Sequence, residues 1–456
     1  MNYLGKLMVD LTHYVLTQFE MNQKVSIFWF RRDLRLEDNI GLNHALKGNS
    51  PVLPIFIFDT ELIDQLPKND ARVTFIHKAI QGLSDHLKQN YNSSIAMYFG
   101  HPVEIFNSLA NNYSIDVVYA NHDYEPYTLE RDAVIKKLLD TKNIAFYTYK
   151  DQVVFEKDEI VKSDGNPYVV YTPYKNRWKE KFDPEKHLGF SDKLSITNNF
   201  IKDPEQPFLS LLDMGFVPSK ITVPVYISSD EFIENYEATR NYPAKTNGTS
   251  RIGPHLRFGT VSIRKIMKQA LKASNAIFWN ELIWREFFMQ ILWHYPKTIN
   301  YAFKPKYDRI QWRNNKAEFK KWKSGQTGYP LVDAGMRELN QTGFMHNRVR
   351  MLVASFLCKH LLIDWRWGEA YFAEKLLDFD LSANVGNWQW AAGSGIDGAP
   401  YFRIFNPITQ VEKFDKQKEY INKWVPDLQE LTYPAKMVDH KIARERCLKV
   451  YKDALG

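Results

Sequence analysis

The chain has 456 residues, of which 44% are hydrophobic, so it is long enough for more than one domain and can bury large cores. Its two cysteines exclude a disulfide framework and an all-cysteine metal site, and no apolar run reaches the roughly 18–20 residues that cross a bilayer, so we expect a cytoplasmic protein without a membrane partner or a metal. The net charge of +7 fits a polyanionic partner, although an ordinary basic protein would carry the same charge.

Residues 24–150 are predicted to form an α/β domain. Short apolar runs rich in branched and aromatic residues predict buried strands at 25–30, 52–58, 95–99, 117–120 and 145–149. Helical stretches lie between them, at 39–46, 71–88, 103–111 and 129–140. This alternation predicts a doubly wound, Rossmann-like parallel sheet. No G-x-G-x-x-G motif follows the first strand, which argues against a dehydrogenase.

The remainder of the chain changes character twice. Residues 151–225 are polar and interrupted by prolines, which predicts a long connector rather than a domain. From 226 to 456 the apolar residues recur at spacings of three and four, which predicts an all-helical domain. The clearest helices are expected at 261–272, 278–295, 331–339 and 345–362.

Two stretches of the helical domain suggest ligand contacts. Gly248–Pro254 is predicted to open a helix, with Thr249 or Ser250 as its cap and Pro254 in its first turn, and with Arg251 it would suit an anion. In Asn280–Phe288, helical spacing puts Glu281, Trp284, Arg285 and Phe288 on one face. That face is either the wall of a pocket for a planar ligand or a solvated Glu281–Arg285 pair, and both interpretations stay open.

Further along, helical spacing brings Asn347, Arg350 and Met351 together, and Arg350 could pair with Asp378 inside the protein. A buried pair of this kind would more plausibly serve a site than stability, since burial costs several kcal/mol per ion. Two unrelated solvated charges are the alternative. Trp312, Trp365 and Trp388 are either separate packing residues or a chain of rings that carries electrons, and their spacing does not decide.

The most distinctive stretch is Asp378–Gly393, with two carboxylates, three amides and two indoles. A helix that opens near Asp380 would place Asp380, Asn384 and Trp388 on one face, at i, i+4 and i+8. Polar groups mixed with a large aromatic make a poor core. They suit a polar heteroaromatic ring that is hydrogen-bonded at its edge.

Six stretches form recognisable motifs: Phe28–Arg35, Thr249–Arg251, Asn280–Glu286, Met345–Arg350, Asp378–Trp390 and Tyr401–Pro407. Together they resemble the DNA photolyase/cryptochrome family over about residues 24–456, and most closely its class I enzymes that repair cyclobutane pyrimidine dimers. Relatives begin a few residues before the first strand, so residues 1–23 are expected to be an N-terminal extension. Met21 is favoured as the natural start over an added amphipathic helix at 1–20.

The resemblance implies FAD bound in the helical domain. The residues that would surround its phosphates and ribityl chain are Tyr236, Thr249, Ser250, Arg251, Ile252 and Gly253. Phe278 and Glu281 would lie near the adenine, while Arg350, Asp378 and Asp380 would hold the isoalloxazine and ribityl region. Asn384 would face flavin N5. Trp388, Trp365 and Trp312 match the family's photoreduction chain. Gly253 departs from the family, since many relatives carry Ser there, and one phosphate hydroxyl is lost.

The resemblance also implies that UV-damaged DNA is the partner of a monomeric protein. A dimer must leave the base stack to reach the flavin. Trp284 and Trp390 would sandwich it, and Glu281, Asn347 and Met351 would touch its bases. The damaged strand would meet Arg240, Arg348, Arg403 and Gln410. Photoexcited reduced FAD would donate the electron that splits the dimer, with Glu281 stabilising the dimer radical anion.

Related functions are weighed by single positions. A (6-4) photolyase is expected to carry His where Asn347 stands, and single-strand-preferring cryptochromes typically carry Tyr where Trp390 stands. Photoreceptor cryptochromes often have a long C-terminal tail. Tyr124–Tyr127 resembles the family's antenna segment, but Tyr127 and Thr128 replace the Asn-Glu of folate-type relatives. Folate, a deazaflavin, a second flavin or no antenna therefore remain open.

Overall fold

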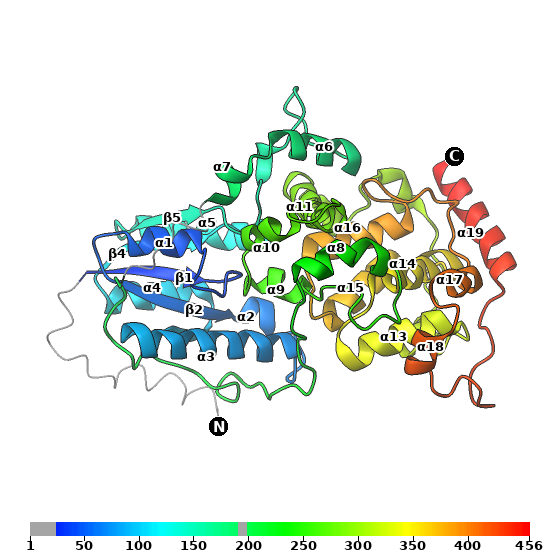
Figure 1. Ribbon diagram of the computed structural model, residues 1–456, viewed down its shortest axis with the longest axis horizontal. Coiled ribbons are helices and arrows are strands. Elements are labelled where there is room, and N and C mark those ends of the chain that lie inside the picture. The colour runs from blue at the N-terminus through cyan, green and yellow to red at the C-terminus, as the bar shows by residue number, and fades with distance from the viewer. Residues whose placement is uncertain (1–23, 190–197) are drawn as a thin grey trace.

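The computed structural model describes residues 24–189 and 198–456, so the predicted N-terminal extension, including Met21, lies outside the described residues. A five-stranded parallel sheet in the order β3-β2-β1-β4-β5 forms the first domain (Figure 1). Its strands are β1 Val25–Phe30, β2 Val52–Asp59, β3 Ala96–Gly100, β4 Ile115–Asn121 and β5 Ala145–Tyr149. Its helices are α1 Ile40–Leu46, α2 Thr60–Ile63, α3 Ala71–Tyr91, α4 Pro102–Asn112 and α5 Pro126–Asp140. The predicted doubly wound sheet is confirmed.

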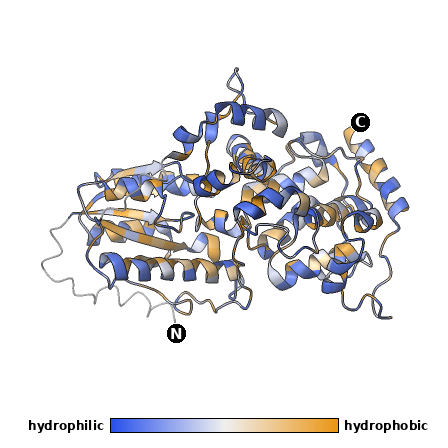
Figure 2. Ribbon diagram, in the orientation of Figure 1, coloured by the Kyte–Doolittle hydropathy of each residue, from blue (hydrophilic) through white to orange (hydrophobic). Residues whose placement is uncertain are grey.

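The alternation of side chains along β1 shows why both faces of the sheet are covered. Phe28 and Phe30 point into a core shared with α1 and α3, whereas Ile27 and Trp29 point into a core shared with α4 and α5. Strands buried on both faces read as continuous apolar runs, and the strands stand out as hydrophobic in Figure 2.

The helical domain begins with α8 Asp230–Thr239 and ends with α19 His440–Leu455. Between these lie α9 Gly253–Phe258, α10 Ile263–Ala270, α11 Ile277–His294, α12 Lys316–Ser324, α13 Pro330–Thr342, α14 Asn347–Ser355, a π-helical turn at Phe356–His360, α15 Trp365–Lys375, α16 Leu381–Ala392, α17 Pro407–Phe414 and α18 Glu419–Trp424. No helix in the described ranges is long and apolar enough to cross a membrane.

The connector is more ordered than its prolines suggested. It contains α6 Tyr171–Lys181 and α7 Pro184–Leu188, which run along one edge of the molecule (Figure 1). Tyr171, Tyr174 and Trp178 recur at helical spacing and are buried, with Tyr174 packed against Phe287 of α11. The connector therefore contributes to the core of the helical domain.

Candidate functional site

A cavity opens between α14, α15 and α16. It brings together many of the predicted site residues: Asn347, Arg350, Met351, Asp378, Asp380, Asn384, Trp388 and Trp390. Ala354, Phe372, Leu376 and Phe379 add apolar wall. An apolar cavity with a few converging polar groups is the usual form of a site for a cofactor or a small ligand.

Helix α16 begins as its sequence predicted. Asp380 is the N-cap, and its Oδ1 accepts hydrogen bonds from the backbone N–H of Ala383 at 3.3 Å and from the hydroxyl of Ser382. One turn and two turns further on, Asn384 and Trp388 face the cavity. The expected polar and aromatic face is therefore confirmed.

The orientation of Asn384 is set by a residue that the sequence did not reveal. Its Nδ2 donates to Glu369 twice, to Oε1 at 2.8 Å and to the backbone oxygen at 3.0 Å. Since these bonds engage the amide nitrogen, Oδ1 is left as the acceptor of a side chain that lines the cavity. Burial raises the pKa of Glu369, and the bond from Asn384 opposes that rise. Glu369 lies on α15, and nothing in its sequence neighbourhood marks it.

Arg350 and Asp378 form the internal pair that the sequence allowed. The guanidinium donates two parallel bonds to the carboxylate, at 2.9 and 3.1 Å, and its Nε donates to the backbone oxygen of Met345 at 2.7 Å. The alternative of two unrelated charges is therefore wrong. Asp378 also touches Gly253, where an added Cβ would lie 2.8 Å from the Asp378 Cβ. The pair joins α14 to the start of α9 at one wall of the cavity.

The predicted cap of α9 is wrong. The helix starts at Gly253 with Ile252 as its N-cap, and no side chain caps it. Arg251 has a φ of +53°, and this left-handed residue separates Thr249 and Ser250 from the helix. The Ser250 hydroxyl instead accepts a bond from the Ile252 N–H at 3.4 Å. Pro254 does lie in the first turn, as expected.

Glu281 is paired, but not with Arg285. It accepts a bond from Arg240 at 2.5 Å, while Arg285 donates to the backbone oxygen of Gln152 at 2.7 Å. The solvated Glu281–Arg285 pair is therefore wrong. Tyr236 lies beneath Arg240 and edge-on to Phe278 at 5.1 Å, and its pKa is raised to about 12 by burial and by Glu281.

Trp284 is covered on one side by the connector. The ring of Tyr171 stacks on it at 3.6 Å with an interplanar angle of 9°, and the Tyr171 hydroxyl donates to the backbone oxygen of Asn280 at 2.7 Å. Trp390 lines the cavity, whereas Trp284 is not among the residues that line it. The structure therefore does not bring the two predicted sandwich residues into one cavity.

Three of the predicted DNA-binding residues form a cluster of cations. The pKa of Arg348 is lowered by burial and by the charges of Arg240 and Arg403. Arg348 also lies over the ring of Phe414 at 4.4 Å and donates to Asn241 at 2.5 Å. Gln410 is half-buried on α17. Like charges held this close favour binding of an anion.

The three tryptophans belong to one hydrophobic core. Trp388 and Trp365 are buried, and Trp312 is partly buried against the same core. A Cβ at Gly368 would lie 2.1 Å from the ring of Trp388, so α15 approaches α16 closely at that point. Of the three, Trp388 lines the cavity, and the route of electron transfer through them stays a prediction.

The predicted antenna segment is engaged within the protein. The Tyr124 hydroxyl donates to Glu156 at 2.6 Å, and the Tyr127 hydroxyl donates to Asp59 at 2.7 Å.

Within residues 24–189 and 198–456, no group of His, Cys, Asp and Glu side chains could hold a metal ion.

Comparisons with known proteins show the family of the chain. Residues 26–190 match a family model described as DNA photolyase, and residues 278–432 match one described as the FAD binding domain of DNA photolyase. A deoxyribodipyrimidine photo-lyase of Halobacterium salinarum is 35% identical, over 95% of this chain and 100% of that relative.

Two solved structures extend the likeness. A class III photolyase from Agrobacterium tumefaciens has a TM-score of 0.84 at 33% identity, over 95% of this chain and 98% of that one. A photolyase from Sulfolobus tokodaii, whose structure holds two FAD molecules, has a TM-score of 0.78 at 33% identity, over 94% of this chain and 100% of that one. The similarity thus reaches a class III enzyme, beyond the class I enzymes that the motifs favoured.

Proposed function

Because the chain belongs to the DNA photolyase/cryptochrome family and carries its FAD-binding domain, we propose that it repairs cyclobutane pyrimidine dimers in DNA with light. One observation carries this proposal. The cavity combines an oriented amide, Asn384, and an ion pair, Arg350–Asp378, with the residues expected to touch a dimer, Asn347, Met351 and Trp390.

The cavity residues fit FAD. The acceptor atom of Asn384 suits a ring N–H at the edge of an isoalloxazine, and the Arg350–Asp378 pair offers further polar contacts beside it. Arg251, Ser250 and the chain before α9 would hold the phosphates. When bound in its reduced form, FAD would supply the photochemistry, giving an electron to the dimer on excitation and recovering it after cleavage.

The protein's own groups would bind and orient the lesion. Trp390 offers a ring face for stacking at the cavity, and Asn347 and Met351 would contact the bases. Trp284, held from behind by Tyr171, would offer the second ring. The two indoles would have to act across the mouth of the cavity, since they do not share its wall.

Arg240 links DNA binding to Glu281. In the free protein the guanidinium satisfies the Glu281 carboxylate. A DNA phosphate near Arg348 and Arg403 would compete for Arg240 and leave Glu281 free to contact the dimer. Binding of the strand would thereby make Glu281 available to the lesion.

A repair assay tests the function. Chemically reduced protein is illuminated with DNA that carries one thymine dimer, and the dimer is quantified against time. We expect loss of the dimer only in the light, with no loss of a (6-4) photoproduct in a parallel substrate. A protein that binds FAD but leaves both lesions intact would instead favour a signalling role, as in cryptochromes.

A further inference from the structure

The segment after β1, Arg31–Arg35, has no part in the proposed repair, yet it reaches into the helical domain. We propose that Arg32 is a positioning residue that fixes Asp380 at the wall of the flavin cavity and balances its charge from the α/β domain. The inference rests on FAD binding in that cavity, but it does not depend on which lesion is repaired.

Backbone contacts seat this segment on the helical domain. The Leu34 N–H donates to the Phe258 oxygen at 3.0 Å, and Arg32 Nε donates to the Arg257 oxygen at 3.2 Å. At Gly259, with a φ of +66°, an added Cβ would lie 2.1 Å from the Arg32 oxygen, so only glycine permits this approach. These contacts fix the backbone that carries the Arg32 side chain against the helical domain.

The guanidinium joins carboxylates of both domains. It lies 3.1 Å from Asp123, 3.1 Å from Glu125 and 2.6 Å from Asp380, and Arg32 is only 8% exposed. Arg257 pairs with Glu125 and, at 3.2 Å, with Asp380. Although burial raises it, the pKa of Asp380 is held below its usual range by Arg32 and Arg257.

The buried cluster holds charges of both signs. The carboxylates of Asp123, Glu125 and Asp380 lie with Arg32, Arg257 and the nearby Arg285, and Arg31 and Arg131 also act on Asp123. Loss of Arg32 would remove a cation that contacts all three carboxylates and leave the cluster more negative, and removing one partner of a buried ion pair is strongly unfavourable.

Asp380 carries this effect to the cavity. One of its oxygens accepts from the first turn of α16, and the other accepts from Arg32 and Arg257. Asp380 lines the cavity itself, as do Asn384 and Trp388 further along the helix. A change at Arg32 would therefore alter the electrostatic potential at the cavity. It would also alter the position of the first turn of α16, the helix that lines the cavity.

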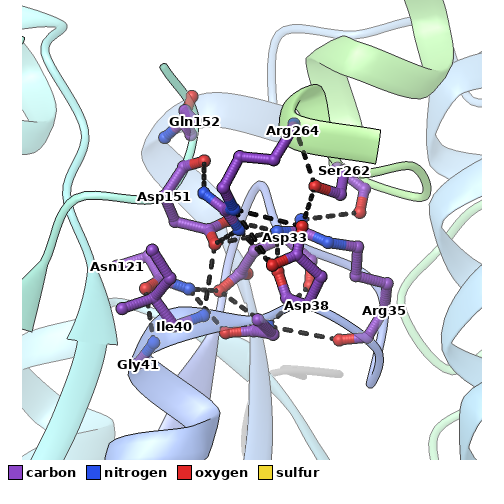
Figure 3. Close-up of polar contacts among 12 residues, drawn as sticks. Asp33, Arg35, Asp38, Ile40, Gly41, Asn121, Asp151, Gln152, Ser262 and Arg264 are labelled. Atoms are coloured by element: carbon purple, nitrogen blue, oxygen red, sulfur yellow. Dashed lines mark hydrogen bonds and ion pairs between the residues drawn. The ribbon is translucent and has the colours of Figure 1, made fainter. Parts of the chain in front are cut away.

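Arg264 provides a matched control. It reaches from α10 into the α/β domain, where it pairs with Asp38 at 3.0 Å and Asp151 at 2.8 Å (Figure 3). Like Arg32 it is buried, cationic and shared between the domains. Neither of its carboxylates lines the flavin cavity. Replacing it removes the same charge from the same interface without touching Asp380.

The experiment compares full-length Arg32→Gln, Arg32→Lys and Arg264→Gln with the unaltered protein. Each is freed of flavin, and its thermal unfolding, its FAD dissociation constant and the midpoint potential of the bound FAD are measured. We expect Arg32→Gln to weaken FAD binding at least tenfold and to shift the potential negative, because a more negative cluster beside the cavity disfavours added electrons. In Arg32→Lys, which keeps the positive charge, the midpoint potential should stay close to that of the unaltered protein. Arg264→Gln should lower the unfolding temperature and leave the potential unchanged.

Unchanged affinity and potential in Arg32→Gln, or an equal shift in Arg264→Gln, would overturn the proposal. If Arg32→Gln fails to fold, Asp123→Asn decides, because it removes a negative charge from the same cluster and should shift the potential positive; no shift there is also a refutation. An unaltered protein that binds FAD without repairing dimers would refute the proposed repair alone.

Discussion

At the scale of single residues, the polar side chains of the cavity are held in place by neighbouring residues. Asn384 is held by Glu369, and Asp378 by Arg350 on one side and Gly253 on the other. Such held side chains keep their geometry without a ligand, which lowers the cost of binding. Small changes beside them should therefore act on flavin affinity more than on folding.

Gly253 offers a direct test of this crowding. The added Cβ of Gly253→Ala would lie 2.8 Å from the Asp378 Cβ and 2.9 Å from its Oδ2, so Asp378 must shift and its pair with Arg350 is strained. We expect FAD binding to weaken by roughly tenfold, or about 1.4 kcal/mol. Titration of the flavin-free protein with FAD measures it. Gly82→Ala, where nothing lies within 4 Å of the new Cβ, is the control and should bind FAD normally.

Glu369 can be separated from flavin contact. Glu369→Leu removes the carboxylate that holds the Asn384 amide, although its backbone oxygen remains. The freed amide can rotate, so we expect weaker FAD binding and a shifted midpoint potential, both measured on the reconstituted protein. Glu369→Gln retains an acceptor oxygen and should lie between the two. Identical potentials in all three proteins would show that Glu369 does not orient Asn384.

His346 predicts how stability depends on pH. It is buried, and its pKa is lowered to about 4 by burial and by Arg350 and Arg348. Between that value and the ordinary 6.5 the unfolded chain binds more protons, so stability is lost as pH falls through this window, by up to roughly 3 kcal/mol. His346→Asn keeps an N-cap for α14 and should flatten the slope of unfolding free energy against pH. An unchanged slope would assign the acid sensitivity elsewhere.

At the scale of elements, α15 and α16 pack so closely that the tryptophans they carry share one core. Trp388→Phe should block photoreduction of oxidised FAD while FAD stays bound, since the ring nearest the cavity is changed. Light-induced loss of the oxidised flavin band measures this. Trp322→Phe is a control, because Trp322 is equally buried and contacts Trp388 edge-on at 6.2 Å. Repair by pre-reduced Trp388→Phe should survive.

On the face formed by α14, α17 and the loop between α16 and α17, contacts to DNA phosphates can be tested separately from recognition of the lesion. Arg348→Ala and Arg403→Ala should weaken binding to damaged and undamaged DNA alike and reduce the salt dependence, because phosphates carry no lesion information. Trp390→Ala should weaken binding to damaged DNA selectively, by roughly 1–3 kcal/mol. Titrations at several salt concentrations measure both. Equal losses for both DNAs in Trp390→Ala would contradict the stacking role.

At the scale of the whole molecule, local patterns predicted the elements well and the contacts poorly. β1 and β5 match their predicted bounds because buried strands show as short apolar runs. Helix α6 was missed since prolines masked its aromatic spacing, and the α9 cap was misplaced since a left-handed Arg251 leaves no trace in composition. Glu369 and Tyr171 act through partners on other elements, which no local pattern encodes.

The close approach at Gly259 also limits how the two halves of the protein could be recombined. A chimera that takes residues 24–150 from a relative would inherit a foreign loop after β1. The chimera would bind the cofactor normally only if that loop places a guanidinium beside Asp380 and still packs against Gly259. The α/β half and the helical half of this chain would then have to be exchanged as matched pairs rather than as independent modules.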